Sequence, residues 1–175
     1  MKKINLIRVI SFAVLSAAAL FFLMLPQIKI SSTGFLQTSE TYYYYNLLNS
    51  EYFEYVSSEY EIIALNGWVS ILTLVTVIVS GLLFVSNGFS CFAPKSKGMK
   101  AITSFFAFLF MVSTLALAAL SIAYALKLKE SGSVSIGGAS FEAIRIEYLG
   151  SFFYLGLGIL TPISIVLSML CKKKK

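Results

Sequence analysis

Four long apolar runs, separated by shorter polar segments, dominate the pattern of this chain. No Asp, Glu, Lys or Arg interrupts Val9–Ile28, Ile62–Pro94, Ala101–Leu126 or Tyr148–Cys171. A helix rises 1.5 Å per residue, so about 20 apolar residues cross a hydrocarbon core of about 30 Å. The runs therefore predict one membrane domain of four transmembrane helices. They fall near residues 8–26, 67–87, 101–126 and 149–171.

Two of the polar segments alternate apolar and polar residues, which is typical of β-strands. One short alternation covers residues 28–33, and a longer one has runs at 134–136 and 144–146 on either side of Gly137-Gly138. A Gly-Gly pair between alternating runs indicates a hairpin. Because an isolated hairpin is only marginally stable, we expect the 28–33 strand to join it. The predicted fold is an all-α integral membrane protein, a four-transmembrane helix bundle with a small extracellular β-sheet or hairpin cap.

Local signals inside and beside the runs bear on helix packing. Small residues recur on one face of each helix, which lets helices approach closely in a membrane. These residues are Ala13 and Ala17, then Ser70, Thr73 and Ser80, then Thr114, Ala118, Ser121 and Ala125, then Ser164 and Ser168. A capping box over residues 58–61 indicates that the second helix begins before its apolar run. Gly156, Gly158 and Pro162 favour a kink in the fourth helix.

Basic and acidic residues occupy different connections, and this predicts the orientation. All eight acidic residues are Glu in 27–66 and 127–148. Three basic clusters carry no acid: Lys2, Lys3 and Arg8; Lys95, Lys97 and Lys100; Lys172 to Lys175. Lys and Arg in short loops stay on the cytoplasmic side of the membrane. Both termini and the 88–100 loop are therefore predicted to be cytoplasmic, and loops 27–66 and 127–148 extracellular.

The first run raises the alternative of a cleaved signal peptide. Its small residues, "SAAA" at 16–19, fall in the middle of the run and a long apolar stretch follows them. Signal peptides place small residues after an apolar core of about 7–15 residues, so the sequence favours a retained helix. No N-x-S/T sequon is present, which favours a bacterial plasma membrane.

The composition also indicates a membrane protein, and the net charge bears on its partners. The chain is 58% hydrophobic and 13% charged, and its net charge is +6, whereas soluble domains carry about 25% charged residues. The positive charge lies beside the predicted helices in small clusters, so anionic membrane lipids are the expected counter-charge. Nucleic acid is not an expected partner.

Several chemistries are excluded by missing residue types. The chain has no His and no Asp, and its two cysteines, Cys91 and Cys171, are both predicted at cytoplasmic helix ends. Serine-histidine catalysis, histidine metal sites and a zinc site therefore have no basis. The charge-free runs also disfavour coupled transport, which generally needs ionisable groups along the path. We expect no catalytic residue, no cofactor and no metal.

The segment from Ser39 to Glu61 is unlike the rest of the chain, with seven tyrosines and five glutamates. Tyrosine suits a membrane–water boundary and also protein interfaces. We expect Tyr42–Tyr45 to lie near the head groups, with Trp68 and Phe152–Tyr154 at the same level. We expect the partner-contact residues to lie further from the membrane. Two of them are glutamates, which favour a partner with a basic surface. The partner-contact residues are Glu51, Tyr52, Phe53, Glu54 and Tyr55.

The layout resembles that of claudin-like tetraspan membrane proteins, which also have four helices, internal termini, a long first outer loop and outer β-structure. The Trp and paired-Cys signature of that family is absent from residues 27–66, so the resemblance is one of layout and carries over no functional residue. The sequence favours a non-enzymatic membrane protein that presents its outer surface to another protein or to a second copy of itself, as a scaffold or complex subunit. Two alternatives stay open. One is a passive channel or accessory transporter subunit, and the other is a lipid-active enzyme using Glu142 and Glu147.

Overall fold

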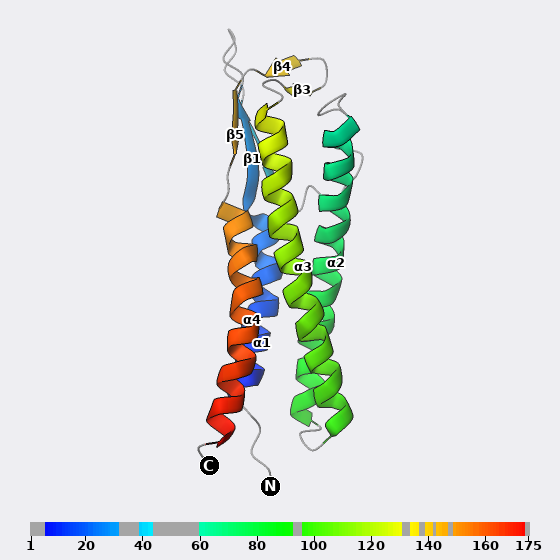
Figure 1. The fold of residues 1–175 in the computed structure, drawn as a ribbon, viewed down its shortest axis with the longest axis vertical. Coiled ribbons are helices and arrows are strands. Elements are labelled where there is room, and N and C mark those ends of the chain that lie inside the picture. Colours follow the sequence, from blue (N-terminus) through cyan, green and yellow to red (C-terminus); the bar gives the residue numbers. More distant parts are fainter. Residues whose placement is uncertain are drawn as a thin grey trace.

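The structure is a computed structural model that describes most of the chain. The described residues are 6–31, 39–43, 60–92, 96–130, 134–136, 139–141, 143–146 and 149–173. Within them lie four helices and one short 3₁₀ turn. They are α1 (Leu6–Phe21), η1 (Phe22–Met24), α2 (Tyr60–Phe92), α3 (Lys97–Glu130) and α4 (Leu149–Lys173). Figure 1 shows the helices side by side, with the strands gathered at one end. We call this end the strand end and the opposite one the Lys97 end.

Four helical segments are long and apolar enough to cross a membrane, as the sequence predicted. They are Leu6–Met24, Gly67–Phe92, Lys97–Lys127 and Gly150–Leu167. The helices α2 and α3 have 33 and 34 residues, which makes each about 50 Å long at 1.5 Å per residue. They exceed an apolar core of about 30 Å, and both run beside the strands past the ends of α1 and α4 (Figure 1). The early start of α2 at Tyr60 agrees with the predicted capping box, of which residues 58 and 59 lie outside the described residues.

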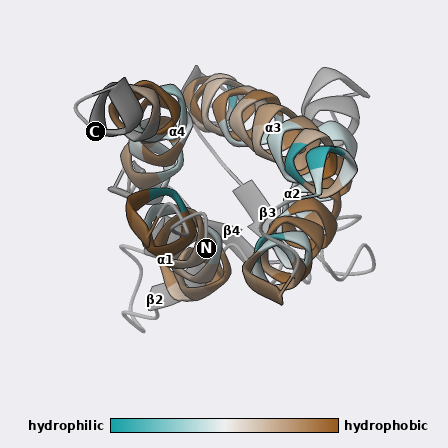
Figure 2. Cartoon of the chain, turned by 90° about the horizontal axis from the view of Figure 1, so that it is seen from below, coloured by the Kyte–Doolittle hydropathy of each residue, from teal (hydrophilic) through white to brown (hydrophobic). Residues whose placement is uncertain are grey.

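The four helices form a ring in chain order, which closes where α4 packs against α1 (Figure 2). Contacts join α1 to α2, α2 to α3, α3 to α4 and α4 to α1. Buried residues recur at alternating spacings of three and four, which is the seven-residue repeat of helices packed side by side at a shallow crossing angle. On α2 the repeat is Val69, Thr73, Thr76, Ser80, Leu83 and Asn87. On α3 it is Thr103, Ala107, Phe110, Thr114, Leu117, Ser121 and Tyr124.

Many positions of this buried repeat carry hydroxyl groups, and most of these donate to the backbone of their own helix. The donor-to-carbonyl distances are between 2.6 and 2.8 Å, to the residue four positions earlier. The residues concerned are Ser16, Thr73, Thr76, Ser80, Thr114 and Thr161. A hydroxyl satisfied in this way fits an apolar interior at little cost. The four-residue ladder expected on α3 is buried along its length, but Ala17 on α1 is exposed, so that part of the packing prediction is wrong.

The end of α1 is set by proline. Leu25 has an extended backbone, with φ −78° and ψ 142°, and its N–H donates to Phe22 O at 3.0 Å. The ring of Pro26 disfavours helical geometry at the residue before it. The chain therefore leaves the helix at Leu25 and enters strand β1 (Pro26–Ser31) at once.

The strands come from both long connections of the chain. Besides β1 they are β2 (Ser39–Tyr43), β3 (Val134–Ile136), β4 (Ala139–Phe141) and β5 (Ala143–Ile146). One sheet has the order β2-β1-β5, and β3 pairs only with β4. The register brings Ile28 opposite Ile146 and Ile136 opposite Ala139.

This pairing corrects the expected one. The sequence predicts a hairpin between residues 134–136 and 144–146, with the strand at 28–33 as the third strand of the same sheet. Instead, β3 forms the hairpin with β4, which follows Gly137-Gly138 directly, and β5 pairs with β1. A two-residue connection favours the pair that lies immediately on either side of it. Strand β5 is therefore not needed for the hairpin and pairs with β1, which is far away in the sequence.

Close packing between α3 and α4 depends on Gly158. A Cβ built at Gly158 would lie 2.6 Å from Leu115 Cγ and Cδ2 and 3.2 Å from Thr114 Oγ1, whereas one at Gly156 would have nothing within 4 Å. We expect Gly158→Ala to lower the free energy of unfolding by about 1–3 kcal/mol because the packed helices must separate. The matched control Gly156→Ala should leave stability unchanged or raise it, since Ala favours the helix. Thermal unfolding in mild detergent measures both, and equal behaviour of the two variants would contradict the close contact.

Candidate functional site

The predicted partner-contact residues lie in the connection between β2 and α2. Glu51, Tyr52, Phe53, Glu54 and Tyr55 are all outside the described residues. Both flanking elements are described: β2 belongs to the sheet at the strand end, and α2 begins there with Tyr60. The segment is therefore held at both of its ends to the same end of the bundle.

The beginning of the Tyr-rich segment takes part in the sheet. Strand β2 pairs with β1 so that Glu40 lies opposite Ile30 and Tyr42 opposite Ile28. In the sheet order β2-β1-β5 only one side of β2 is paired within the described residues. An edge strand offers backbone donors and acceptors to a further strand.

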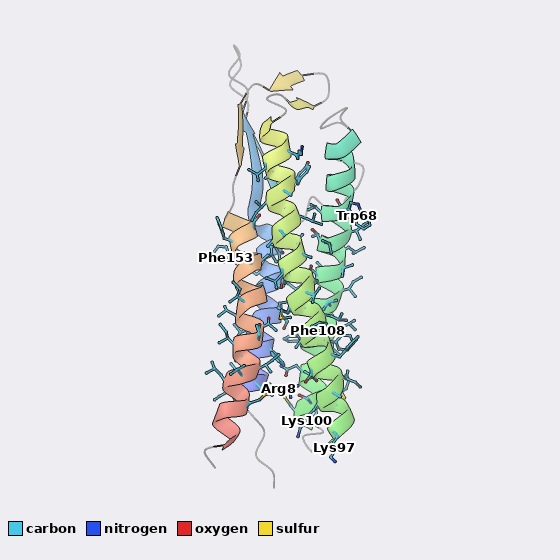
Figure 3. All side chains as sticks on the ribbon, viewed as in Figure 1. Arg8, Trp68, Lys97, Lys100, Phe108 and Phe153 are labelled. Atoms are coloured by element: carbon cyan, nitrogen blue, oxygen red, sulfur yellow. The ribbon has the colours of Figure 1, made fainter. Side chains whose placement is uncertain are left out.

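Large aromatic side chains at the strand half of the bundle divide between its outside and its core. Trp68, Phe152 and Phe153 are exposed, and Figure 3 shows Trp68 and Phe153 in the half nearer the strands. The same level was expected for Tyr154, but this residue is fully buried and its hydroxyl donates to Ala19 O at 3.2 Å. The expectation is wrong because Tyr154 occupies a position of the buried repeat, where the ring packs edge-on at 6.2 Å from Phe22.

At the Lys97 end, Arg8 joins α1 to α3. Its Nη2 donates to Lys100 O at 3.2 Å and to Ser104 Oγ at 3.1 Å, and its guanidinium lies 5.5 Å from the centre of the Phe12 ring. Figure 3 shows Arg8 beside Lys100 at this end. The helices α1 and α3 are not neighbours in the ring, so this long side chain links two opposite members of the bundle.

Asn87 forms the second polar link at the Lys97 end. It is 2% exposed, and its Nδ2 donates to Val9 O at 2.7 Å, which joins α2 to α1. Its Oδ1 is buried without a partner. Thr103 Oγ1 adds a link from α3 to α2 by donating to Ser86 O at 3.2 Å. Three pairs of helices are thus connected by side chain–backbone hydrogen bonds at one end.

Sequence reasoning did not identify Asn87. The residue lies in the second apolar run and carries no formal charge, so the charge pattern does not distinguish it. A buried amide inside a membrane helix is costly without hydrogen bonds and therefore marks a structural or functional contact. An uncharged polar side chain within a predicted span was the signal that would have found it.

Within the part of the chain that the structure describes, no three His, Cys, Asp or Glu residues gather into a group able to hold a metal ion. Cys91 is half-buried on α2, and its Sγ lies 3.5 Å from Asn87 O. The polar side chains that link helices at the Lys97 end supply hydroxyl, amide and guanidinium groups. They can bind and orient by hydrogen bonding.

Comparison of the chain with protein-family models, with curated proteins and with solved structures found no match.

Asn87 allows a test of the polar link at the Lys97 end. We expect Asn87→Leu to cost about 1 kcal/mol of stability, because it removes the bond to Val9 O together with the unpartnered Oδ1. Asn87→Asp at pH 8 should cost at least about 3 kcal/mol, because a buried carboxylate, an acceptor only, would face the Val9 carbonyl. Thermal unfolding of both variants in detergent at pH 8 gives the comparison. An Asp variant as stable as the Leu variant would be incompatible with the contact.

Proposed function

We propose that this protein is a non-enzymatic membrane protein that assembles with another protein through its strand end. The four-helix bundle is the membrane anchor and scaffold. Residues 51–55 of the Tyr/Glu segment between β2 and α2 form the contact surface, and the sheet supports it. The observation that carries the proposal is the pairing of β1 with both β2 and β5, which ties the first long connection to the second.

The packing of the helices supports a scaffold. Phe12, Phe110 and Tyr154 are fully buried within the bundle. These large rings lie in one continuous core with the aliphatic residues around them. A densely packed interior of this kind has low compressibility and holds its ends at a fixed separation. A passive pore would require these rings to leave the core.

The arrangement of the connections supports a contact surface at the strand end. A β-strand paired on both sides restricts the chain more than a free loop does, so β1 provides a fixed support for β2. The candidate residues Tyr52, Phe53 and Tyr55 follow β2 by about ten positions and precede α2 by a few. Tyrosine is enriched among the interface residues that dominate binding energies. Glu51 and Glu54 favour a partner with a basic surface.

The distribution of charge supports an orientation with the strand end outside the cell. In the structure α1 begins and α4 ends at the Lys97 end. Arg8, Lys97 and Lys100 lie there as well (Figure 3). Basic residues are retained on the cytoplasmic side and meet anionic lipids there. The proposal accordingly places both termini in the cytoplasm, the small sheet outside as a cap on the bundle, and the protein in a plasma membrane.

The two native cysteines test this orientation. We expect a membrane-impermeant maleimide to leave Cys91 and Cys171 unlabelled in intact cells and to label them after permeabilisation. Because Cys91 is half-buried beside Asn87, the Cys91→Ser variant should be used to follow Cys171 alone. A matched control, Ser131→Cys, places a thiol in the second connection and should be labelled from outside. Labelling of Cys91 and Cys171 of the unmodified protein in intact cells would contradict the proposed orientation.

The contact surface is tested by changing three residues together. We expect the triple variant Tyr52→Ser, Phe53→Ser and Tyr55→Ser to lose a co-purifying partner in mild detergent, with a decrease in recovery of at least about tenfold, the equivalent of 1.4 kcal/mol. The measurement is affinity purification of the tagged full-length chain followed by quantitative mass spectrometry. A differently tagged second copy of the chain, expressed in the same cells, detects self-association.

A matched triple variant serves as the control for this test. Tyr43→Ser, Tyr44→Ser and Tyr45→Ser removes the same number of rings from the same segment, and we expect the partner to be retained. Unchanged recovery with the first variant would exclude residues 52–55 as the contact surface. Loss of the folded bundle, seen as reduced yield and a lower unfolding temperature, would instead assign these residues to the fold.

A further inference from the structure

Two buried hydroxyl groups near the strand end of α3 differ from the other buried hydroxyls. Ser121 is 1% exposed and Tyr124 is fully buried. Neither Ser121 Oγ nor Tyr124 OH has a hydrogen-bond partner among the residues that the structure describes. Leaving a buried donor and acceptor unpaired costs the desolvation of each group, so a pair of such groups is rare in a folded protein.

The contrast with equivalent residues in the same bundle sharpens this observation. Ser16 and Ser80 occupy the same kind of buried position as Ser121, and each donates to the carbonyl four residues earlier at 2.7 and 2.6 Å. Tyr154 is as buried as Tyr124, and its hydroxyl donates to Ala19 O. The hydroxyls of Ser121 and Tyr124 are therefore unpaired at positions where equivalent hydroxyls of the bundle are paired.

The positions of the two residues allow one ligand to serve both. They are three apart on α3, so they lie on one face of the helix about one turn from each other. A tyrosine side chain in a helix points back towards the N-terminus and covers the preceding turn, which here carries Ser121. Ala118 and Ala125, which have small side chains, flank the pair on the same buried face of α3.

We propose that Ser121 and Tyr124 form an internal water-binding site within the strand half of the bundle. A water molecule donates two hydrogen bonds and accepts two, so it can accept from one hydroxyl and donate to the other. Buried waters of this kind make about three hydrogen bonds to groups that are otherwise unsatisfied. Both residues lie within the apolar span Lys97–Lys127, so the site holds water where the surrounding medium supplies none.

The test is a double-mutant cycle on the full-length protein in mild detergent. We expect Tyr124→Phe and Ser121→Ala each to lower the unfolding temperature by about 2–4 °C, the shift of a lost hydrogen bond in a chain of this size. The double variant should lose less than the sum, because both hydroxyls bind the same water. Tyr154→Phe and Ser80→Ala are matched controls for the loss of a hydroxyl with a protein partner, and their effects should add.

Three results would overturn the proposal. Unfolding temperatures that stay the same or rise in both Tyr124→Phe and Ser121→Ala would show that the two hydroxyls are dry. Strictly additive losses would show that they do not share a ligand. An experimental structure at a resolution that reveals solvent, showing a protein group within hydrogen-bonding distance of either hydroxyl, would also rule the site out. Solvent density bridging Ser121 Oγ and Tyr124 OH would establish it.

Discussion

The satisfaction of polar groups inside an apolar medium is the constraint on which the rest of this structure depends. The apolar part of a membrane offers no water to a donor or acceptor that faces it, so a polar side chain there is costly unless a partner inside the bundle satisfies it. Most hydroxyls of the bundle do this by donating to the carbonyl of the preceding turn, as Thr73 and Thr114 do. Small polar residues can then occupy the buried repeat without forming a polar channel. Their small volume lets the helices approach closely where no hydrophobic driving force brings them together.

The two ends of the bundle are held by different interactions, and this difference has a functional consequence. At the Lys97 end, Arg8 and Asn87 bind backbone carbonyls of other helices. At the strand end, β1 pairs with strands from both connections. Side chains therefore link the helices at one end, whereas backbone pairing of strands links the two long connections at the other. This difference supports the proposed role of the strand end as the surface that meets a protein partner.

The same residue type takes different roles according to its place in the repeat. Tyr154 is turned into the core by its position on α4, although its neighbour Phe153 faces outward. Asn87 uses one end of its amide to connect two helices and leaves the other end unpaired. Ser121 and Tyr124 stand at positions where other residues bond to the backbone. Polar groups that do not follow the common pattern are therefore the most informative residues of this bundle.

The sequence by itself determined the four membrane helices, because uncharged runs of about 20 residues are decided by the cost of placing charge in hydrocarbon. It also identified the small-residue ladder on α3, since that ladder depends on the local spacing of residues along a helix. Only the tertiary structure decided that 143–146 pairs with β1, that Tyr154 is buried and that Asn87 joins α2 to α1. Strand partners far apart in the sequence compete on nearly equal local terms, and the rotation of a helix about its axis decides which of two adjacent rings is buried. Both outcomes depend on contacts between elements, which a local pattern does not contain.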